Sequence, residues 1–189
     1  MNEKSTLRAQ LRRAWQTTID CQYRTQLINS EHGLKVHFCA ALLSQFESSK
    51  MKTRRRVFIE PSLRLADGSV RYPDLVICDT KSVVGIIELK YTPRGRPVPS
   101  GLLKDMETLT HAAADSESLQ IVNERFLGKF VTQVAYPLAG NAVLCWAGLY
   151  RGPKELELKK DISNDAFLKR FLQLSALTYR DADPTICLG

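Results

Sequence analysis

The sequence predicts an α/β fold of the α+β kind, and three observations support that prediction. Residues 31–48 and 101–114 each repeat apolar side chains with the spacing of an amphipathic helix. Residues 70–91 contain two apolar, β-branched runs on either side of a short polar turn, which is typical of a β-hairpin. Residues 57–61 add a strand before the hairpin, and the apolar run at 142–150 adds a buried strand after it. The predicted order is therefore helix, three strands, helix, strand.

The chain begins with a predicted basic helix over residues 5–28. Arg8, Arg12 and Arg13 lie off its apolar stripe, where we expect them to be solvated. A DNA-binding arm and a dimerisation element are the alternative roles for this helix. The stripe itself, which should pack on the core, consists of Leu7, Leu11, Trp15, Ile19 and Tyr23.

Local signals place the other elements. Asn29 or Ser30 is a favourable N-cap for the helix that follows the first one, and Ser100 is a favourable N-cap for the next. Prolines and a glycine make residues 92–100 a loop. The remaining predictions are a helix over residues 118–127, a short strand over 155–159, a helix from Ser163 or Asn164 to about 178, and a frayed tail after Arg180.

Length and charge bound the possible functions. The chain has 189 residues, enough for one domain with a substantial core. We expect a single domain, with an N-terminal helix at 1–28, a core at about 29–150 and a C-terminal helix at 160–180. The net charge of +7 and the isoelectric point of about 9.3 favour a polyanionic partner such as nucleic acid.

The cysteines and the hydropathy pattern suggest where the protein is found. The five cysteines are widely spaced and form no Cys-x-x-Cys pair, which argues against a zinc site and a disulfide framework. No apolar run suggests a signal peptide or approaches the roughly 20 residues of a membrane span. The expectation is a cytoplasmic protein without a membrane partner.

The hairpin carries charged residues in strands that are apolar enough to be buried. Side chains alternate between the two faces of a strand, so Glu88 and Lys90 share one face. With residues 80–82 as the loop, Asp79 should pair with Val83. The same count then places Asp74 opposite Glu88, with Cβ atoms about 4.5–5.5 Å apart.

These carboxylates predict a metal site. Burial of unpaired charges costs several kcal/mol or more, and a shared cation would remove that cost. Two carboxylates at this separation can hold one hard divalent cation through their oxygens. A register slip of one residue would separate Glu88 from Asp74, so the site depends on the register.

Pro73-Asp74 followed by Glu88-Leu89-Lys90 resembles the PD-(D/E)XK nuclease superfamily, which has the restriction-endonuclease-like fold. The resemblance covers roughly residues 29–110. It implies an α-β-β-β-α-β core with a mixed central sheet flanked by helices. It also implies an endonuclease that hydrolyses DNA phosphodiester bonds with a divalent metal.

The resemblance assigns roles to individual residues. Asp74, Glu88 and Lys90 would be catalytic, and the two carboxylates would bind Mg²⁺ or Mn²⁺. The backbone carbonyl of Leu89 would be a third ligand, and Lys90 would contact the attacking water or the scissile phosphate. The candidates for an additional ligand are Glu31 and its rival Glu60.

Basic residues near these carboxylates are candidates for contact with phosphates. The run at 50–56 is the densest in the chain, and the arginines of the 92–100 loop carry forked donors that suit phosphate. Related nucleases also place a supporting polar residue on the helix after the hairpin. The predicted nucleic-acid-binding residues are Arg54, Arg55, Arg56, Arg94, Arg96 and Lys104.

Several alternatives remain open. The chain could be a structure-specific nuclease that resolves DNA junctions, a non-cleaving nucleic-acid-binding subunit of a larger complex, or an RNA-directed nuclease. A homodimer or a partner subunit could supply specificity. His32 and His37 are five residues apart and would lie on different helix faces, and the sequence contains no Gly-rich phosphate loop with Lys-Ser/Thr.

Overall fold

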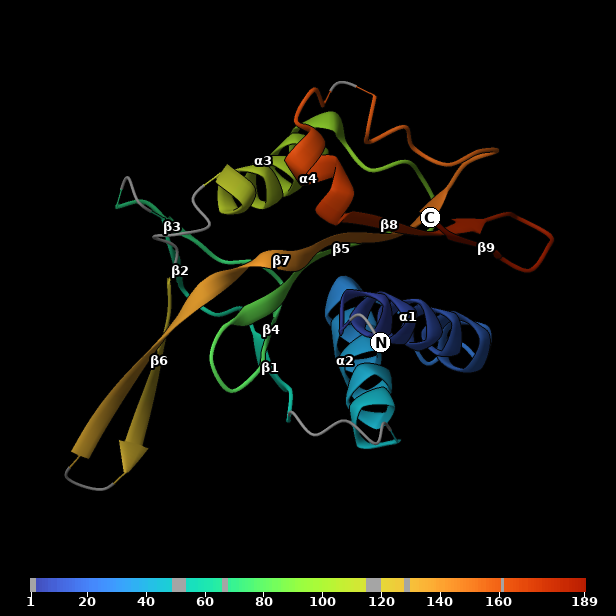
Figure 1. The fold of residues 1–189 in the computed structure, drawn as a ribbon. Coiled ribbons are helices and arrows are strands. Elements are labelled where there is room, and N and C mark those ends of the chain that lie inside the picture. The colour runs from blue at the N-terminus through green and yellow to red at the C-terminus, as the bar shows by residue number, and fades with distance from the viewer. Residues whose placement is uncertain (1–2, 49–53, 66–67, 115–119, 128–129, 161) are drawn as a thin grey trace.

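The computed structural model describes residues 3–48, 54–65, 68–114, 120–127, 130–160 and 162–189. In this part of the chain, the fold is α+β, with a mixed nine-stranded sheet whose central part lies between two layers of helices (Figure 1). No helix in these ranges is long and apolar enough to cross a membrane.

The sheet consists of a central mixed part and a lateral extension. In the central part, β5, β7 and β8 are parallel neighbours, and antiparallel strands complete both sides. Its order is β1 (Arg56–Ile59), β4 (Leu75–Cys78), β5 (Val83–Thr92), β7 (Phe130–Arg151), β8 (Phe171–Thr178) and β9 (Thr185–Leu188). The extension pairs the first half of β7 with β6 (Gln120–Leu127), followed by β2 (Leu63–Arg64) and β3 (Val70–Arg71).

The helices form one layer on each side of this sheet (Figure 1). The first layer contains α1 (Glu3–Thr17), which continues into the π-helix η1 (Thr18–Tyr23), and α2 (Glu31–Ser48). The second layer contains α3 (Pro99–Ala114) and the short helix α4 (Asp165–Arg170).

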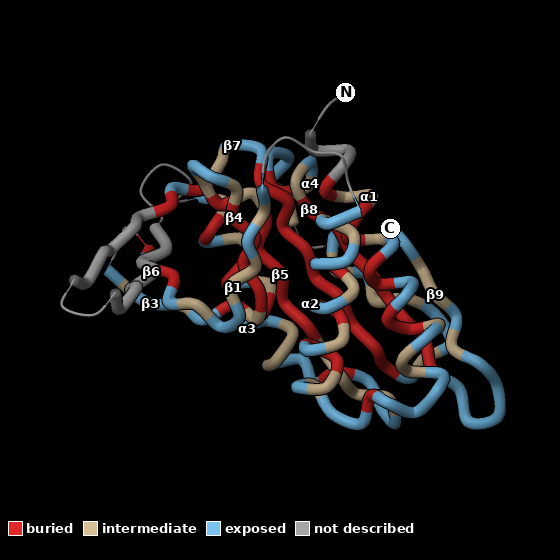
Figure 2. Tube along the Cα trace, turned by 90° about the horizontal axis from the view of Figure 1, so that it is seen from below, coloured by how far each residue is buried: buried red, intermediate tan, exposed pale blue. Residues whose placement is uncertain are grey.

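Each helical layer packs on its own hydrophobic cluster, and the central strands are buried between the two clusters (Figure 2). Trp15 and Phe38 meet edge to face in the first cluster, with ring centroids 5.8 Å apart. Trp146 and Phe167 belong to the second. Residues that alternate along β5 contribute to opposite clusters, as Ile86 and Ile87 do. This alternation directs Glu88 to the side of α3.

The hairpin register is close to the predicted one and differs at the turn. Val83 pairs with Cys78 rather than with Asp79. A bulge between Val83 and Gly85 shifts the register by one residue, after which Leu75 pairs with Ile87. One further step in this register brings Asp74 opposite Glu88, as predicted.

The predicted helix over 118–127 is wrong where the structure describes that segment. Residues 120–127 form β6, which pairs along its whole length with the first residues of β7 in an antiparallel hairpin. The apolar positions at Ile121 and Val122 are compatible with a helix or a strand, and pairing with β7 favours the strand.

The predicted C-terminal helix ends early. Asn164 caps α4 by accepting a hydrogen bond from the Phe167 amide at 3.0 Å, but the helix stops at Arg170. Residues 171–178 form β8, in which every residue is buried. A strand covered on both faces is apolar throughout, so its sequence resembles a buried helix.

Three smaller predictions also differ from the structure. The N-terminal helix ends near Tyr23 rather than residue 28. Residues 155–159 form no strand and are held by the side chains of Tyr150 and Gln173, which bond the Leu156 amide and carbonyl. The tail is not frayed, because residues 185–188 form β9 against β8.

Candidate functional site

Charged side chains from both helical layers meet at the paired ends of β4 and β5. Asp74 precedes β4, and Glu88 and Lys90 lie on β5. Ion pairs and electrostatic contacts connect them to residues from α2, α3 and the end of β1. We call this group the acidic cluster: Glu31, Lys35, Glu60, Asp74, Glu88, Lys90 and Asp105.

Asp74 is fixed by contacts to both of its carboxylate oxygens. Oδ1 lies 2.6 Å from Lys35 Nζ, and Oδ2 accepts a hydrogen bond from the Leu89 amide at 2.7 Å. The backbone carbonyl of Asp74 accepts from the Glu60 amide at 3.0 Å. These contacts join three chain segments and hold the carboxylate at the end of the hairpin.

Lys35 links Asp74 to Glu60. Its side chain is only 6% exposed, although it ends in an ammonium group that contacts both carboxylates. Burial alone would lower the pKa of Lys35, but hydrogen bonds and attraction from Asp74 and Glu60 raise it overall. The same contact lowers the pKa of Glu60. Lys35 therefore remains a cation within the cluster.

Glu60 adopts an unusual backbone conformation. Its φ is 47°, a left-handed value that is sparsely populated for residues other than glycine. The residue follows β1 and precedes Pro61. This turn directs the Glu60 side chain to Lys35 while its amide bonds Asp74.

Glu88 is the most perturbed acid of the cluster. Burial, together with the neighbouring Asp74 and Asp105 carboxylates, raises the pKa of Glu88 to about 9. Without a bound cation, Glu88 is therefore protonated at neutral pH. A divalent cation between these carboxylates would favour the ionised form, because an opposite charge at close range lowers a carboxyl pKa.

Lys90 lies on the same side of β5 as Glu88 and contacts one acid from each helical layer. Its Nζ is 3.4 Å from Asp105 Oδ2 and 3.9 Å from Glu31 Oε2. Asp105 also accepts a hydrogen bond from Trp146 Nε1 at 3.2 Å, and Glu31 accepts one from the Tyr91 amide at 3.2 Å. Burial raises the pKa of Asp105, and Lys90 and Trp146 oppose that effect.

The Leu89 carbonyl is oriented toward Asp74. In a strand, the amide and the carbonyl of one residue face the same neighbour, and the Leu89 amide bonds Asp74. Continued register would place Leu89 opposite Pro73, which has no amide hydrogen to donate. The Leu89 carbonyl therefore remains a candidate ligand, as the sequence suggested.

The acidic cluster contains oxygen donors of the kind that bind a divalent metal, but the described side chains are not arranged as a preformed metal site. No group of three or more His, Cys, Asp or Glu side chains among the described residues has the arrangement of a metal site. Asp74 and Glu88 nevertheless present adjacent carboxylates, which are the oxygen donors that Mg²⁺ and Mn²⁺ prefer. Two carboxylates and one carbonyl make a partial ligand set that water and substrate oxygens would complete.

The basic residues that follow the 50–56 run have separate environments. Arg54 is exposed. Arg55 hydrogen-bonds Gln10, and its guanidinium lies 5.4 Å from the ring centroid of Phe46. Arg56 donates to Tyr136 Oη at 2.9 Å. The cluster does not include these arginines, and the Arg55 and Arg56 contacts join elements of the fold. Residues 50–53 lie outside the described ranges.

The other predicted basic residues also lie outside the cluster. Arg94 and Arg96 line a groove beyond Lys90, at the ends of the parallel strands. Lys104 is exposed, and its backbone carbonyl accepts from Thr108 Oγ1 at 3.1 Å. On α3, the neighbouring Asp105 faces the cluster instead.

Sequence reasoning missed Lys35 and Asp105, although both carry a detectable signal. Lys35 is four residues after Glu31 and therefore shares its helix face. Asp105 lies within the apolar stripe of α3, three residues after Leu102 and four before Leu109. An ionisable residue on the buried face of a helix is a candidate for a site.

Comparisons with known proteins identify no relative. No protein-family model, curated protein or solved structure matches this chain significantly.

Proposed function

We propose that the protein is a divalent-metal-dependent nuclease that hydrolyses DNA phosphodiester bonds, with the restriction-endonuclease-like fold. One observation carries the proposal: Asp74 and Glu88 interact at the end of one hairpin, and Lys90 shares the Glu88 side of β5. The order of α2, β1, β4, β5, α3 and β7 supports the fold assignment, because it contains the helix, three strands, helix and strand of that core.

The residues of the cluster would divide the reaction between them. A bound Mg²⁺ or Mn²⁺ would neutralise charge on the phosphate and make water more acidic. Asp74 and Glu88 would hold it with the Leu89 carbonyl. Lys90 would orient the attacking water or contact the scissile phosphate. Asp105 holds the Lys90 ammonium in place through the 3.4 Å contact. The water oxygen would form a bond to phosphorus and release one proton to solvent, while the bond from phosphorus to the leaving oxygen breaks and that oxygen takes up a proton from solvent.

A cleavage assay tests this function. Supercoiled plasmid, linear duplex, single-stranded DNA, a four-way junction and RNA are each incubated with Mg²⁺, with Mn²⁺ and with chelator. We expect metal-dependent cutting of DNA by the wild type and a loss of about 100-fold or more in Lys90→Ala, the usual range for removal of a positioned catalytic group. Lys81→Ala removes an exposed ammonium at the turn of the hairpin, away from the cluster, and should leave cutting unchanged.

The substrate panel separates the alternatives. Preference for the four-way junction would identify a junction-resolving nuclease, and preference for RNA would contradict the DNA assignment. Equal cutting by wild type and Lys90→Ala, or cutting that persists in chelator, would reject the proposed site.

A second candidate is a non-cleaving nucleic-acid-binding subunit, and the position of Lys35 favours it. The Lys35 ammonium contacts both Asp74 and Glu60, so Asp74 has a permanent cation partner without any metal. Nucleic-acid binding in chelator, with no cleavage and no effect of Mg²⁺ on stability, would support this alternative.

A further inference from the structure

A basic groove lies beyond the acidic cluster, where the parallel strands β5, β7 and β8 end. Its cavity volume is about 1220 Å³. Its walls come from the end of η1 and the connection to α2, from the end of β5 and the loop after it, and from the β8–β9 connection. Ligands of open α/β sheets generally bind outside the carboxyl ends of parallel strands, which is where this groove lies.

Arginine dominates the charge of the groove. Five arginines and one acid, Asp183, line it, a surplus of four positive charges in a chain whose net charge is +7. More than half of the net charge is therefore concentrated at one end of the sheet. The five are Arg24, Arg94, Arg96, Arg151 and Arg180.

Most of these guanidinium groups are available to a ligand. Arg24 pairs with Asp20 at 3.4 Å and with Asp183 at 3.8 Å. For the other four, no carboxylate of the described residues lies within ion-pair distance, and all four are exposed. Exposed arginines without acidic partners present forked donors that match phosphate oxygens.

The fold holds part of this arginine set in place. The Arg151 amide donates to the Gly95 carbonyl at 2.9 Å, which joins the end of β7 to the 93–96 loop. Arg96 lies close to Gly152, where an added Cβ would be 3.3 Å from its Nε. The groove therefore combines exposed donors with a backbone held by a hydrogen bond.

Three tyrosines alternate with the arginines in the groove wall. Tyr91 donates from its hydroxyl to the Ile28 carbonyl at 3.2 Å, and Tyr23 lies near it. Tyr179 is 40% exposed, and its hydroxyl is 3.3 Å from Thr185 Oγ1. All three side chains line the groove, and tyrosine rings can stack with bases.

The groove and the acidic cluster are neighbours along β5. Tyr91 follows Lys90 directly, and its amide donates to Glu31, which also faces Lys90. The groove lining therefore begins at the residue that follows Lys90 on the same strand.

We propose that this arginine–tyrosine groove binds an unpaired strand of nucleic acid and leads it toward Lys90. Arginines with interspersed aromatic rings are the arrangement by which proteins hold single strands, with phosphates on the cations and bases on the rings. The groove exceeds the roughly 300–1,000 Å³ of small-molecule pockets, which favours a polymer. Duplex bases are stacked on each other and cannot use the tyrosines. Only the delivery to Lys90 rests on the proposed function.

Binding in chelator tests the groove without cleavage. Fluorescence anisotropy compares a labelled oligothymidylate with a hairpin duplex of the same nucleotide count. We expect tighter binding of the single strand. In Arg151→Gln/Arg180→Gln, the slope of log affinity against log salt should fall by about 1.4, since each phosphate contact on a single strand contributes about 0.7.

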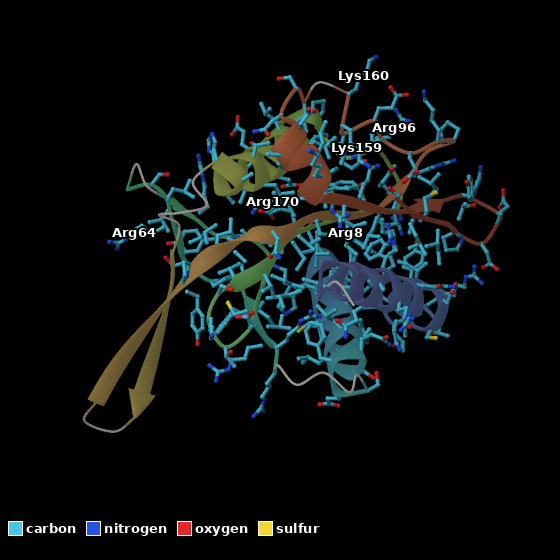
Figure 3. All side chains as sticks on the ribbon, in the orientation of Figure 1. Arg8, Arg64, Arg96, Lys159, Lys160 and Arg170 are labelled. Carbon is cyan, nitrogen blue, oxygen red and sulfur yellow. The ribbon has the colours of Figure 1, made fainter. Side chains whose placement is uncertain are left out.

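A matched pair of variants controls for total charge. Arg64→Gln/Lys81→Gln removes two exposed positive charges outside the groove. Figure 3 shows Arg64 beside β2, at the opposite end of the sheet from Arg96. This pair should retain the wild-type salt slope.

The tyrosine contribution has its own test. Tyr179→Leu should weaken oligothymidylate binding by about 5- to 150-fold, the range for loss of one stacked base, and Tyr179→Phe should retain binding. Thermal melting of each variant verifies that it is folded.

Three results would overturn the inference: equal loss of salt slope in both double variants, hairpin binding as tight as that of the single strand, or equal binding by the Leu and Phe variants. Binding with these dependences and no cutting would refute the nuclease proposal while leaving the groove assignment intact. Cutting by a protein whose groove variants bind normally would refute the groove assignment while leaving the nuclease proposal intact.

Discussion

Lys35 is the residue on which the acidic cluster depends in the metal-free protein. It is buried, and its ammonium contacts the carboxylates of Asp74 and Glu60. Among the described residues, no cation lies within ion-pair distance of Glu88, which is protonated instead, with its pKa raised to about 9 by burial and by the neighbouring acids. Each acid of the hairpin thus avoids an unpaired buried negative charge. Asp74 pairs with the Lys35 ammonium, and Glu88 keeps its proton.

Lys35→Met should destabilise the protein, because it leaves the Asp74 carboxylate without its cation. We expect a loss of about 3 kcal/mol, the lower end of the cost of breaking a buried pair, since Asp74 keeps some contact with solvent. Urea denaturation measures this loss. If Asp74 is a metal ligand, Mg²⁺ should recover more stability in the variant than in the wild type. A variant as stable as the wild type in chelator would contradict this account.

The stability of the metal-free protein should fall as pH rises, because the folded state keeps a proton on Glu88 that the unfolded state releases. An unfolded glutamate titrates near pH 4.5, whereas the folded pKa is about 9. The stabilisation is complete below about pH 4.5 and is lost toward pH 9, at up to about 1.4 kcal/mol per pH unit.

Glu88→Gln removes the titratable carboxyl group and should reduce the pH dependence of the free energy of unfolding. Urea midpoints across that pH window, in chelator, measure the effect. Glu107→Gln, at an exposed position on α3, is the control and should keep the wild-type slope. An unchanged slope in Glu88→Gln would show that another group carries it.

At the scale of elements, β7 positions the cluster although it contributes no acid to it. Glu88 pairs with Trp146 and Lys90 with Gly148 along the parallel β5–β7 ladder. Trp146 in turn bonds Asp105 on α3. An added Cβ at Gly148 would lie 2.1 Å from the Trp146 ring, so this glycine is required for the ring to lie where it does.

Gly148→Ala should therefore displace Trp146 and destabilise the protein by about 1–3 kcal/mol, as overpacking does in well-packed cores. Thermal unfolding measures the change, and a shift in tryptophan emission would report the displaced ring. Gly140→Ala is the matched control on the same strand, because nothing lies within 4 Å of a Cβ there. Equal stability of the two variants would refute the steric argument.

The sequence predicted elements whose signals are local. The helix at 31–48 and the pairing of Asp74 with Glu88 follow from periodicity and from a count across one turn. Residues 120–127 and 171–178 were predicted as helices, because an apolar run becomes a strand only when distant partners are available. Lys35 and Asp105 were missed for the same reason: their role depends on how helices dock on the sheet.

At the scale of the whole molecule, contacts between the chain ends join the two helical layers across the sheet. Arg8 on α1 donates to the carbonyls of Lys169 and Phe171 at 2.8 and 3.1 Å, where α4 meets β8. Arg12 donates to the Gly189 carbonyl at 2.6 Å. These arginines, expected to be solvated, connect the first helix to the last elements of the chain (Figure 3 shows Arg8 beside the sheet).

We therefore predict one cooperative unfolding transition, as for a single domain. Trp15 lies in the core on the α1 side and Trp146 in the core on the α3 side. Trp146→Phe and Trp15→Phe leave one fluorescent reporter in each core. In each variant, the fluorescence midpoint should coincide with the circular dichroism midpoint of the same protein, as in a two-state transition. Separate midpoints would show that the layers unfold independently.

The unbroken pairing of β5 with β7 from Gly85 to Thr92 bears on the products that the proposed nuclease would release. Because Lys90, Tyr91 and Thr92 are consecutive on this rigid element, the groove and the cluster are held at a constant spacing. A nuclease built this way would cut a strand held in the groove at one fixed distance from it, and an oligonucleotide bound by its end would give a single band on a sequencing gel.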